Sequence, residues 1–149
     1  MRQFFIGYDL GKEQDFSALS LIERVGNQLH LVGLLRFPRR TDYLVQLDVL
    51  DDLLAFLGPD AKVSLAVDAS GPGQLAVEEI RRRHPGLDVD PVVITAGKSA
   101  RDLPGGRRAV PRAELIGNMR RCLESGVLRV ASGLEWESEL ERELDALKN

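Results

Sequence analysis

The sequence predicts one α/β domain in which a mixed β-sheet carries helices on both faces. Three apolar segments separated by short turns open the chain, which favours an antiparallel meander. Later apolar segments alternate with helical patterns, as in parallel βαβ units. The chain has 149 residues, 44% of them hydrophobic, and no stretch with the composition of a linker. We therefore expect residues 1–149 to form a single domain around one core.

The first third of the chain predicts three strands. Residues 4–8 are a short apolar run that ends at Asp9. Residues 17–25 and 28–37 flank Gly26-Asn27, a pair that favours a hairpin turn between two strands. These three strands should pair in antiparallel order.

Two helices and a strand follow. Thr41 is placed to cap a helix whose leucines recur at helical spacing until Gly58-Pro59. Residues 62–67 predict a buried strand that ends at Asp68. The next helix should begin near Pro72 and end before Pro85-Gly86.

The last part predicts one strand, a loop and two helices. Residues 89–94 predict the fifth strand, and residues 95–110 predict a polar loop rich in glycine and arginine. Pro111 should begin a helix that stops at Gly126, followed by an extended segment over 127–131. Ser132 and Glu135 match a capping box for a last helix. The apolar residues of that helix are Trp136, Leu140, Leu144 and Leu147.

Composition excludes several classes of protein. No apolar run approaches the roughly 20 residues that a membrane span needs, so we expect no membrane association. Cys122 is the single cysteine, which excludes an internal disulfide and a cysteine-rich zinc site. We expect the reducing cytoplasm as the compartment.

Basic residues gather between residues 97 and 121, which carry a net charge of +5 although the whole chain carries −3. Arginine accounts for 16 of the 20 basic residues, and its planar guanidinium suits phosphate. Phosphate contacts bind DNA without reading its sequence. The candidate DNA-binding residues are Lys98, Arg101, Arg107, Arg108 and Arg112.

Two aspartates follow predicted strands. Asp9 ends the first strand and Asp68 ends the fourth. If these strands are parallel neighbours, both carboxylates emerge at one edge of the sheet. Mg²⁺ and Mn²⁺ prefer oxygen ligands, and a pair of such ions activates water and stabilises the leaving oxygen of a phosphodiester. Asp9 and Asp68 are therefore the candidate catalytic and metal-ligating residues.

With these residues the sequence resembles the C-terminal ribonuclease-H-like nuclease domain of phage terminase large subunits. The resemblance centres on residues 7–11 (GYDLG) and 67–73 (VDASGPG). Further matching stretches are residues 15–19, 91–97, 110–115 and 125–131. The resemblance thus extends along nearly the whole chain in the family's order.

The resemblance implies a ribonuclease-H-like fold and a metal-dependent endonuclease that cuts duplex DNA during genome packaging. It implies that Asp9 and Asp68 bind Mg²⁺ or Mn²⁺. It also implies duplex DNA and other terminase or packaging subunits as partners, in a bacterial cytoplasm and with a phage or prophage origin.

Two features differ from the family pattern. The family's ATP-binding motor half is missing, and the family takes further acidic ligands from a segment after its last helix. That segment would begin near Asn149, where the sequence ends. The helical spacing of Glu137, Glu141 and Asp145 favours a solvated face over a replacement set of ligands.

Three alternatives remain open. A non-catalytic DNA-binding or assembly module would keep the fold with an incomplete metal site. A junction-resolving nuclease would share the GYDLG pattern. Residues 71–76 (GPGQLA) match a dinucleotide fingerprint, although a Rossmann domain lacks the antiparallel start.

Overall fold

The computed structural model describes residues 1–11 and 14–146, and its strands form one eight-stranded sheet. The strand order across the sheet is β6-β7-β5-β4-β1-β2-β3-β8. In chain order the strands are β1 (Gln3–Asp9), β2 (Ser17–Val25), β3 (Gln28–Phe37), β4 (Lys62–Asp68), β5 (Asp88–Thr95), β6 (Arg101–Asp102), β7 (Arg108–Pro111) and β8 (Leu128–Val130). The meander β1-β2-β3 is antiparallel, whereas β4, β5 and β7 extend it in parallel from β1. The predicted mixed sheet is confirmed.

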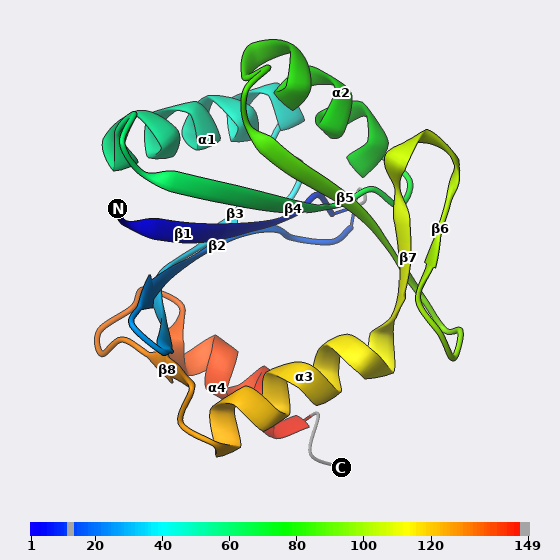
Figure 1. The fold of residues 1–149 in the computed structure, drawn as a ribbon. Coiled ribbons are helices and arrows are strands. Elements are labelled where there is room, and N and C mark those ends of the chain that lie inside the picture. Colours follow the sequence, from blue (N-terminus) through cyan, green and yellow to red (C-terminus); the bar gives the residue numbers. More distant parts are fainter. Residues whose placement is uncertain (12–13, 147–149) are drawn as a thin grey trace.

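Helices cover both faces of this sheet (Figure 1). Helices α1 (Tyr43–Leu57) and α2 (Gly73–Arg83) lie on one face, and α3 (Arg112–Glu124) and α4 (Glu137–Ala146) lie on the other. No helix within the described ranges is both long and apolar enough to cross a membrane.

The main core lies between the sheet and α1 and α2. Alternate side chains of β1 and β4 point into it, and each helix contributes buried apolar residues at helical spacing. Its most buried members include Ile6, Leu47, Leu65 and Ile80. Helix α3 has no buried residue and connects β7 at one side of the sheet to β8 at the other. The face under α3 is therefore less tightly covered than the face under α1 and α2.

The prediction of a loop over residues 95–110 was wrong. The segment contains β6, the short 3₁₀ helix η1 (Pro104–Gly106) and the start of β7, which pairs in parallel with β5. Gly105 and Gly106 make the turn between the strands with φ of +80° and +74°. Strands this short have no local periodicity, and they are held by pairing at the edge of the sheet.

The predicted cap of α1 was also misplaced by one residue. The backbone N–H of Leu44 donates to the Asp42 carboxylate at 2.8 Å, so Asp42 is the N-cap. The Thr41 hydroxyl instead donates to the Pro38 carbonyl at 2.6 Å. Both residues can cap a helix, and the turn after β3 decides which one does.

The capping box predicted at Ser132 and Glu135 does not form. Helix α4 begins at Glu137, whose carboxylate accepts a hydrogen bond from the Gly133 backbone N–H at 3.2 Å. The helix therefore starts two residues after the predicted Glu. Leu147, predicted on its apolar face, lies outside the described residues.

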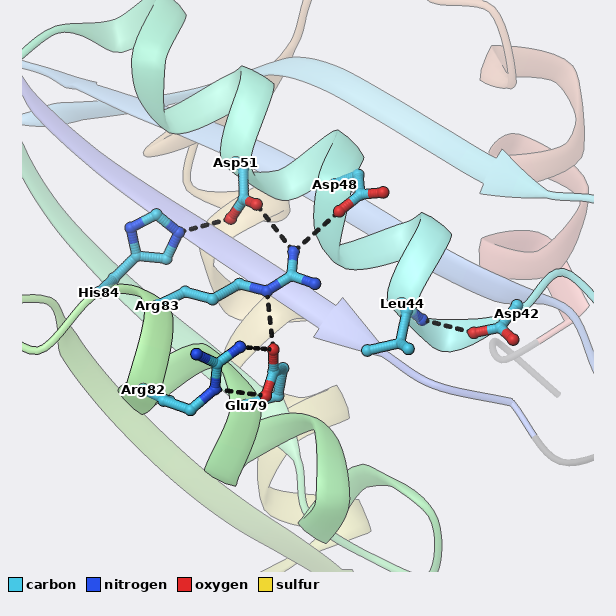
Figure 2. A network of polar contacts seen from close by, with 8 residues as sticks. All are labelled: Asp42, Leu44, Asp48, Asp51, Glu79, Arg82, Arg83 and His84. Atoms are coloured by element: carbon cyan, nitrogen blue, oxygen red, sulfur yellow. Dashed lines mark hydrogen bonds and ion pairs between the residues drawn. The ribbon is translucent and has the colours of Figure 1, made fainter.

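An ionic network joins α1 to the end of α2 (Figure 2). Arg83 contacts Asp48 at 2.9 Å and Asp51 at 2.8 Å with Nη1, and Glu79 at 3.0 Å with Nε. The imidazole of His84 lies 2.5 Å from the other Asp51 oxygen. Arg83 therefore bridges three carboxylates and fixes the two helices on one face of the sheet.

We expect the stability of the protein to depend on pH in the acid range because Glu79 belongs to this network. Hydrogen bonds from Arg82 and Arg83 lower the pKa of Glu79 to about 2, from an ordinary value of 4.5. A lowered folded-state pKa adds stability above pH 4.5, and this stability is lost as the pH falls from 4.5 towards 2. Thermal melts should show Glu79→Gln less stable than wild type at neutral pH, with the difference shrinking through that window. A difference that stays constant down to about pH 2 would contradict this role.

Candidate active site

Asp9 and Asp68 lie side by side at the ends of two central strands. β1 and β4 are parallel neighbours, and the pairing of Tyr8 with Val67 puts the two aspartates at the next position of each strand. Both residues line a cavity of about 320 Å³ on the sheet face towards α3, where Leu115 forms part of the wall. The juxtaposition expected from the sequence is therefore present.

The neighbouring Asp68 carboxylate disfavours ionisation of Asp9. The pKa of Asp9 is raised, first by burial, next by the charge of Asp68 and a hydrogen bond with it, and then by the charge of Asp15. Asp9 nevertheless remains exposed to solvent. Within the described ranges no Lys, Arg or His side chain forms an ion pair with either carboxylate of the pair. The site thus concentrates negative charge that no basic side chain of the described residues compensates by an ion pair.

The turn after β4 fixes Asp68. Its Oδ1 accepts a hydrogen bond from the Ser70 backbone N–H at 3.0 Å, and Ala69 N–H donates to the Val92 carbonyl at 2.8 Å. Gly73 starts α2 so close to β4 that a Cβ there would lie 1.7 Å from the Asp68 carbonyl oxygen. Gly73, the second glycine of the GPGQLA stretch, therefore allows α2 to pack closely against the end of β4 at Asp68.

The turn after β1, next to Asp9, is also closely packed. Gly11 N–H donates to the buried Ser17 hydroxyl at 3.0 Å, and a Cβ on Gly11 would lie 2.5 Å from the Phe16 carbonyl oxygen. This glycine allows the chain to pack against itself at the base of the β1–β2 turn.

Sequence reasoning missed a buried polar pair next to the site. The Tyr8 hydroxyl donates to Gln46 Oε1 at 2.7 Å, and Gln46 Nε2 donates to the Thr41 carbonyl at 2.9 Å. Tyr8 and Gln46 are 3% and 2% exposed. They tie the end of β1 to α1, on the sheet face opposite to the two carboxylates. A glutamine at an apolar helix position was the available signal.

The donor set fits a hard divalent cation in part. Two adjacent carboxylates match the oxygen ligands that Mg²⁺ and Mn²⁺ prefer. Among the described residues, however, no group of three or more His, Cys, Asp or Glu side chains is arranged to hold a metal ion. Glu137 accepts the Gly133 bond, and Glu141 and Asp145 line a groove between α3 and α4. These three acids therefore do not complete the Asp9–Asp68 pair.

The candidate DNA-binding residues lie on the β5–β6–β7 side of the sheet. Lys98 and Arg101 are exposed, and Arg112 is the exposed first residue of α3. Arg107 Nε donates to the Pro104 carbonyl at 3.1 Å. Arg108 forms an ion pair with Asp90 of β5, which compensates its charge. The five residues thus share one flank of the site, and Arg108 differs from Arg107 in that its partner within the protein is a carboxylate.

Replacing Asp68 by Asn should lower the pKa of Asp9. The substitution removes the Asp68 charge that disfavours ionisation of Asp9, whereas the burial of Asp9 remains. We expect the Asp9 pKa to fall yet to stay above its ordinary value. Carboxyl ¹³C chemical shifts followed against pH in metal-free protein would measure this. An unchanged Asp9 titration would mean that the two carboxylates do not interact.

This sheet order, with helices on both faces and paired acids at the ends of β1 and β4, defines a ribonuclease-H-like, nuclease-type fold. Terminase nucleases of solved structure share it. The large terminase nuclease from thermophilic phage G20c with bound zinc matches with a TM-score of 0.64 and 22% identity, over 99% of this chain and 70% of that one. The resemblance found in the sequence is thus confirmed at the level of the fold.

Two other matches extend the comparison. The large terminase from a second thermophilic bacteriophage, in complex with ATP-gamma-S, gives a TM-score of 0.61 at 15% identity, over 97% of this chain and 32% of that one. The manganese-soaked, inhibitor-bound human cytomegalovirus terminase nuclease domain gives 0.56 at 13% identity, over 87% of this chain and 64% of that one.

The chain spans less than two thirds of most of these proteins, and only 30% of the second phage's large terminase in another structure. No protein-family model matches the sequence, and no curated protein matches it.

Proposed function

We propose that this chain is a metal-dependent endonuclease domain that cuts duplex DNA in the manner of a terminase nuclease. The observation that carries the proposal is the pair Asp9 and Asp68, which lies at adjacent parallel strand ends and lines one cavity. The fold shared with terminase nucleases supports it, because solved members of that group are described with bound magnesium or soaked with manganese.

In this proposal Asp9 and Asp68 hold Mg²⁺ or Mn²⁺ with their carboxylate oxygens. The bound metal would supply activation of a water nucleophile and stabilisation of the leaving phosphodiester oxygen. The Ser70 backbone N–H fixes the orientation of Asp68 by its hydrogen bond to Oδ1. Because its pKa is raised, Asp9 holds a proton more tightly than an ordinary aspartate does. A cation that binds at the pair would displace this proton.

The DNA backbone would be held by the basic flank of the site. Lys98, Arg101, Arg107 and Arg112 are the proposed phosphate contacts, and Arg108 would first have to leave Asp90. Other packaging subunits are proposed as partners because the fold is shared with large terminases. We also propose that residues 1–149 act as one domain, in the cytoplasm of a bacterial host.

Plasmid cleavage at low salt tests the function. Purified protein should nick supercoiled plasmid with Mn²⁺ or Mg²⁺ and should leave it intact with EDTA. Folded protein that binds metal and DNA yet never nicks the plasmid would contradict the proposal.

A second candidate function is a non-catalytic DNA-binding or assembly module of the same fold. The observation that favours it is the limit of two acids at the site, since no third metal-ligating residue joins them among the described residues. This candidate predicts DNA binding without metal-dependent cleavage.

A further inference from the structure

A row of residues in register across the strands passes through the carboxylate pair and contains an arginine on each side of it. Arg36 on β3 lies in register with Asp9, with one residue of β2 between them. Arg108 on β7 lies in register with Asp68, with one residue of β5 between them. Neighbouring strands are about 4.8 Å apart, so each arginine lies about 10 Å along the row from its aspartate. Residues paired in this way point to the same face of the sheet.

The two arginines differ in their surroundings. Arg108 is paired with Asp90, whereas Arg36 has no carboxylate partner among the described residues. The Arg36 guanidinium instead lies over two aromatic rings, with Cζ 3.7 Å from the centroid of Phe16 and 5.4 Å from that of Trp136. Its charge is therefore held in place and is not neutralised by a carboxylate of the described residues.

A second arginine shares the same ring. Arg39 lies two residues beyond the end of β3, is exposed, and places Cζ 4.4 Å from the centroid of Phe16. It too has no carboxylate partner within the described ranges. A guanidinium stacked on an aromatic ring keeps its in-plane N–H groups free for two hydrogen bonds to a phosphate. Because two guanidinium groups occupy the Phe16 ring, the ring is not available to stack on a base.

We propose that Arg36 and Arg39, held over Phe16, form a phosphate-binding surface for duplex DNA on the β3 side of the carboxylate pair. This surface lies across the site from the residues 98–112, so a duplex passing Asp9 and Asp68 would be contacted on both sides. The inference rests on the proposed function for the choice of ligand. The sequence alone did not indicate this surface, because only the pairing of the strands in the structure shows that Arg36 lies level with Asp9.

The test is binding of a short fluorescent DNA duplex in EDTA, measured by anisotropy over a range of salt concentrations. Each lost phosphate contact lowers the slope of log affinity against log salt by about 0.9. We expect a loss of about 1 for Arg39→Gln and about 2 for Arg36→Gln/Arg39→Gln. The charge-keeping pair Arg36→Lys/Arg39→Lys should restore most of the slope.

Arg81→Gln is the matched control, since Arg81 is exposed on α2, which covers the other face of the sheet. It should leave the slope unchanged. A wild-type slope in Arg39→Gln, which removes only an exposed side chain, would overturn the proposal, as would a wild-type protein that binds no duplex at low salt. Arginine-dependent binding by a protein that never cleaves DNA would support this surface and contradict the nuclease function.

Discussion

Asp9→Asn and Asp68→Asn should each abolish metal-dependent cleavage while leaving the protein folded. Each substitution removes one of the two carboxylates that the proposed metal site contains. Altering a residue that merely supports a metal ligand commonly lowers affinity or activity by about 10- to 100-fold. Loss of a direct ligand should therefore lower the cleavage rate by at least about 100-fold, measured by plasmid nicking with Mn²⁺.

These variants should also be at least as stable as wild type without metal. Burial and the neighbouring charge raise the pKa of Asp9, so its ionised form weakens the folded state at neutral pH. Removing either charge relieves this, and the metal-free Tm should rise. Asp52→Asn, an exposed position on α1, is the control and should retain full cleavage. Cleavage that survives in both site variants would contradict the assigned roles.

Gly73→Ala should be among the most destabilising single substitutions in this chain. The new Cβ would lie 1.7 Å from the Asp68 carbonyl oxygen and 2.8 Å from its carbonyl carbon, so backbone must move. Overpacking typically costs about 1–3 kcal/mol and occasionally more, and this contact is with backbone. We expect about 3 kcal/mol, which lowers Tm by roughly 6–12 °C in a chain of this length.

Gly73→Ala should also impair metal binding, because the displaced backbone carries Asp68. The matched control is Gly86→Ala, where a Cβ meets no atom within 4 Å and the backbone has no left-handed φ. Its stability should stay within about 0.5 kcal/mol of wild type. Equal Tm values for the two variants would show that β4 and α2 do not pack as described.

The longer strands β1 to β5 were predictable because each has a local signal. Residues 17–25 and 28–37 match β2 and β3, since apolar runs around Gly26-Asn27 specify a hairpin. The positions of Asp9 and Asp68 followed from two strand ends and one assumption, that the strands are parallel neighbours. The parallel pairing of β1 with β4 in the structure confirms that assumption.

Features that depend on tertiary pairing were not predictable. The strands β6 and β7 are short, and sheet pairing positions them: β7 pairs with the edge of β5, and β6 pairs with β7. The start of α4 was misassigned because a Ser-x-x-Glu pattern is met by chance, whereas Glu137 bonds the Gly133 N–H in the structure. Arg36 was overlooked because its distance from Asp9 along the chain hides the register that the two residues share, and Arg39 because only its contact with the Phe16 ring places it beside Arg36.

The most direct test of the central claim is where Mn²⁺ binds to the protein. Paramagnetic Mn²⁺ broadens the backbone amide signals nearest to it, which can be followed by titration without any DNA. We expect Ser70 and Ala18 to broaden first, since Ser70 bonds Asp68 and Ala18 pairs with Asp9. Amides in Asp68→Asn should not broaden at the same Mn²⁺ concentration. Broadening centred on the acidic residues of α4, or none near Ser70, would contradict a metal site at Asp9 and Asp68.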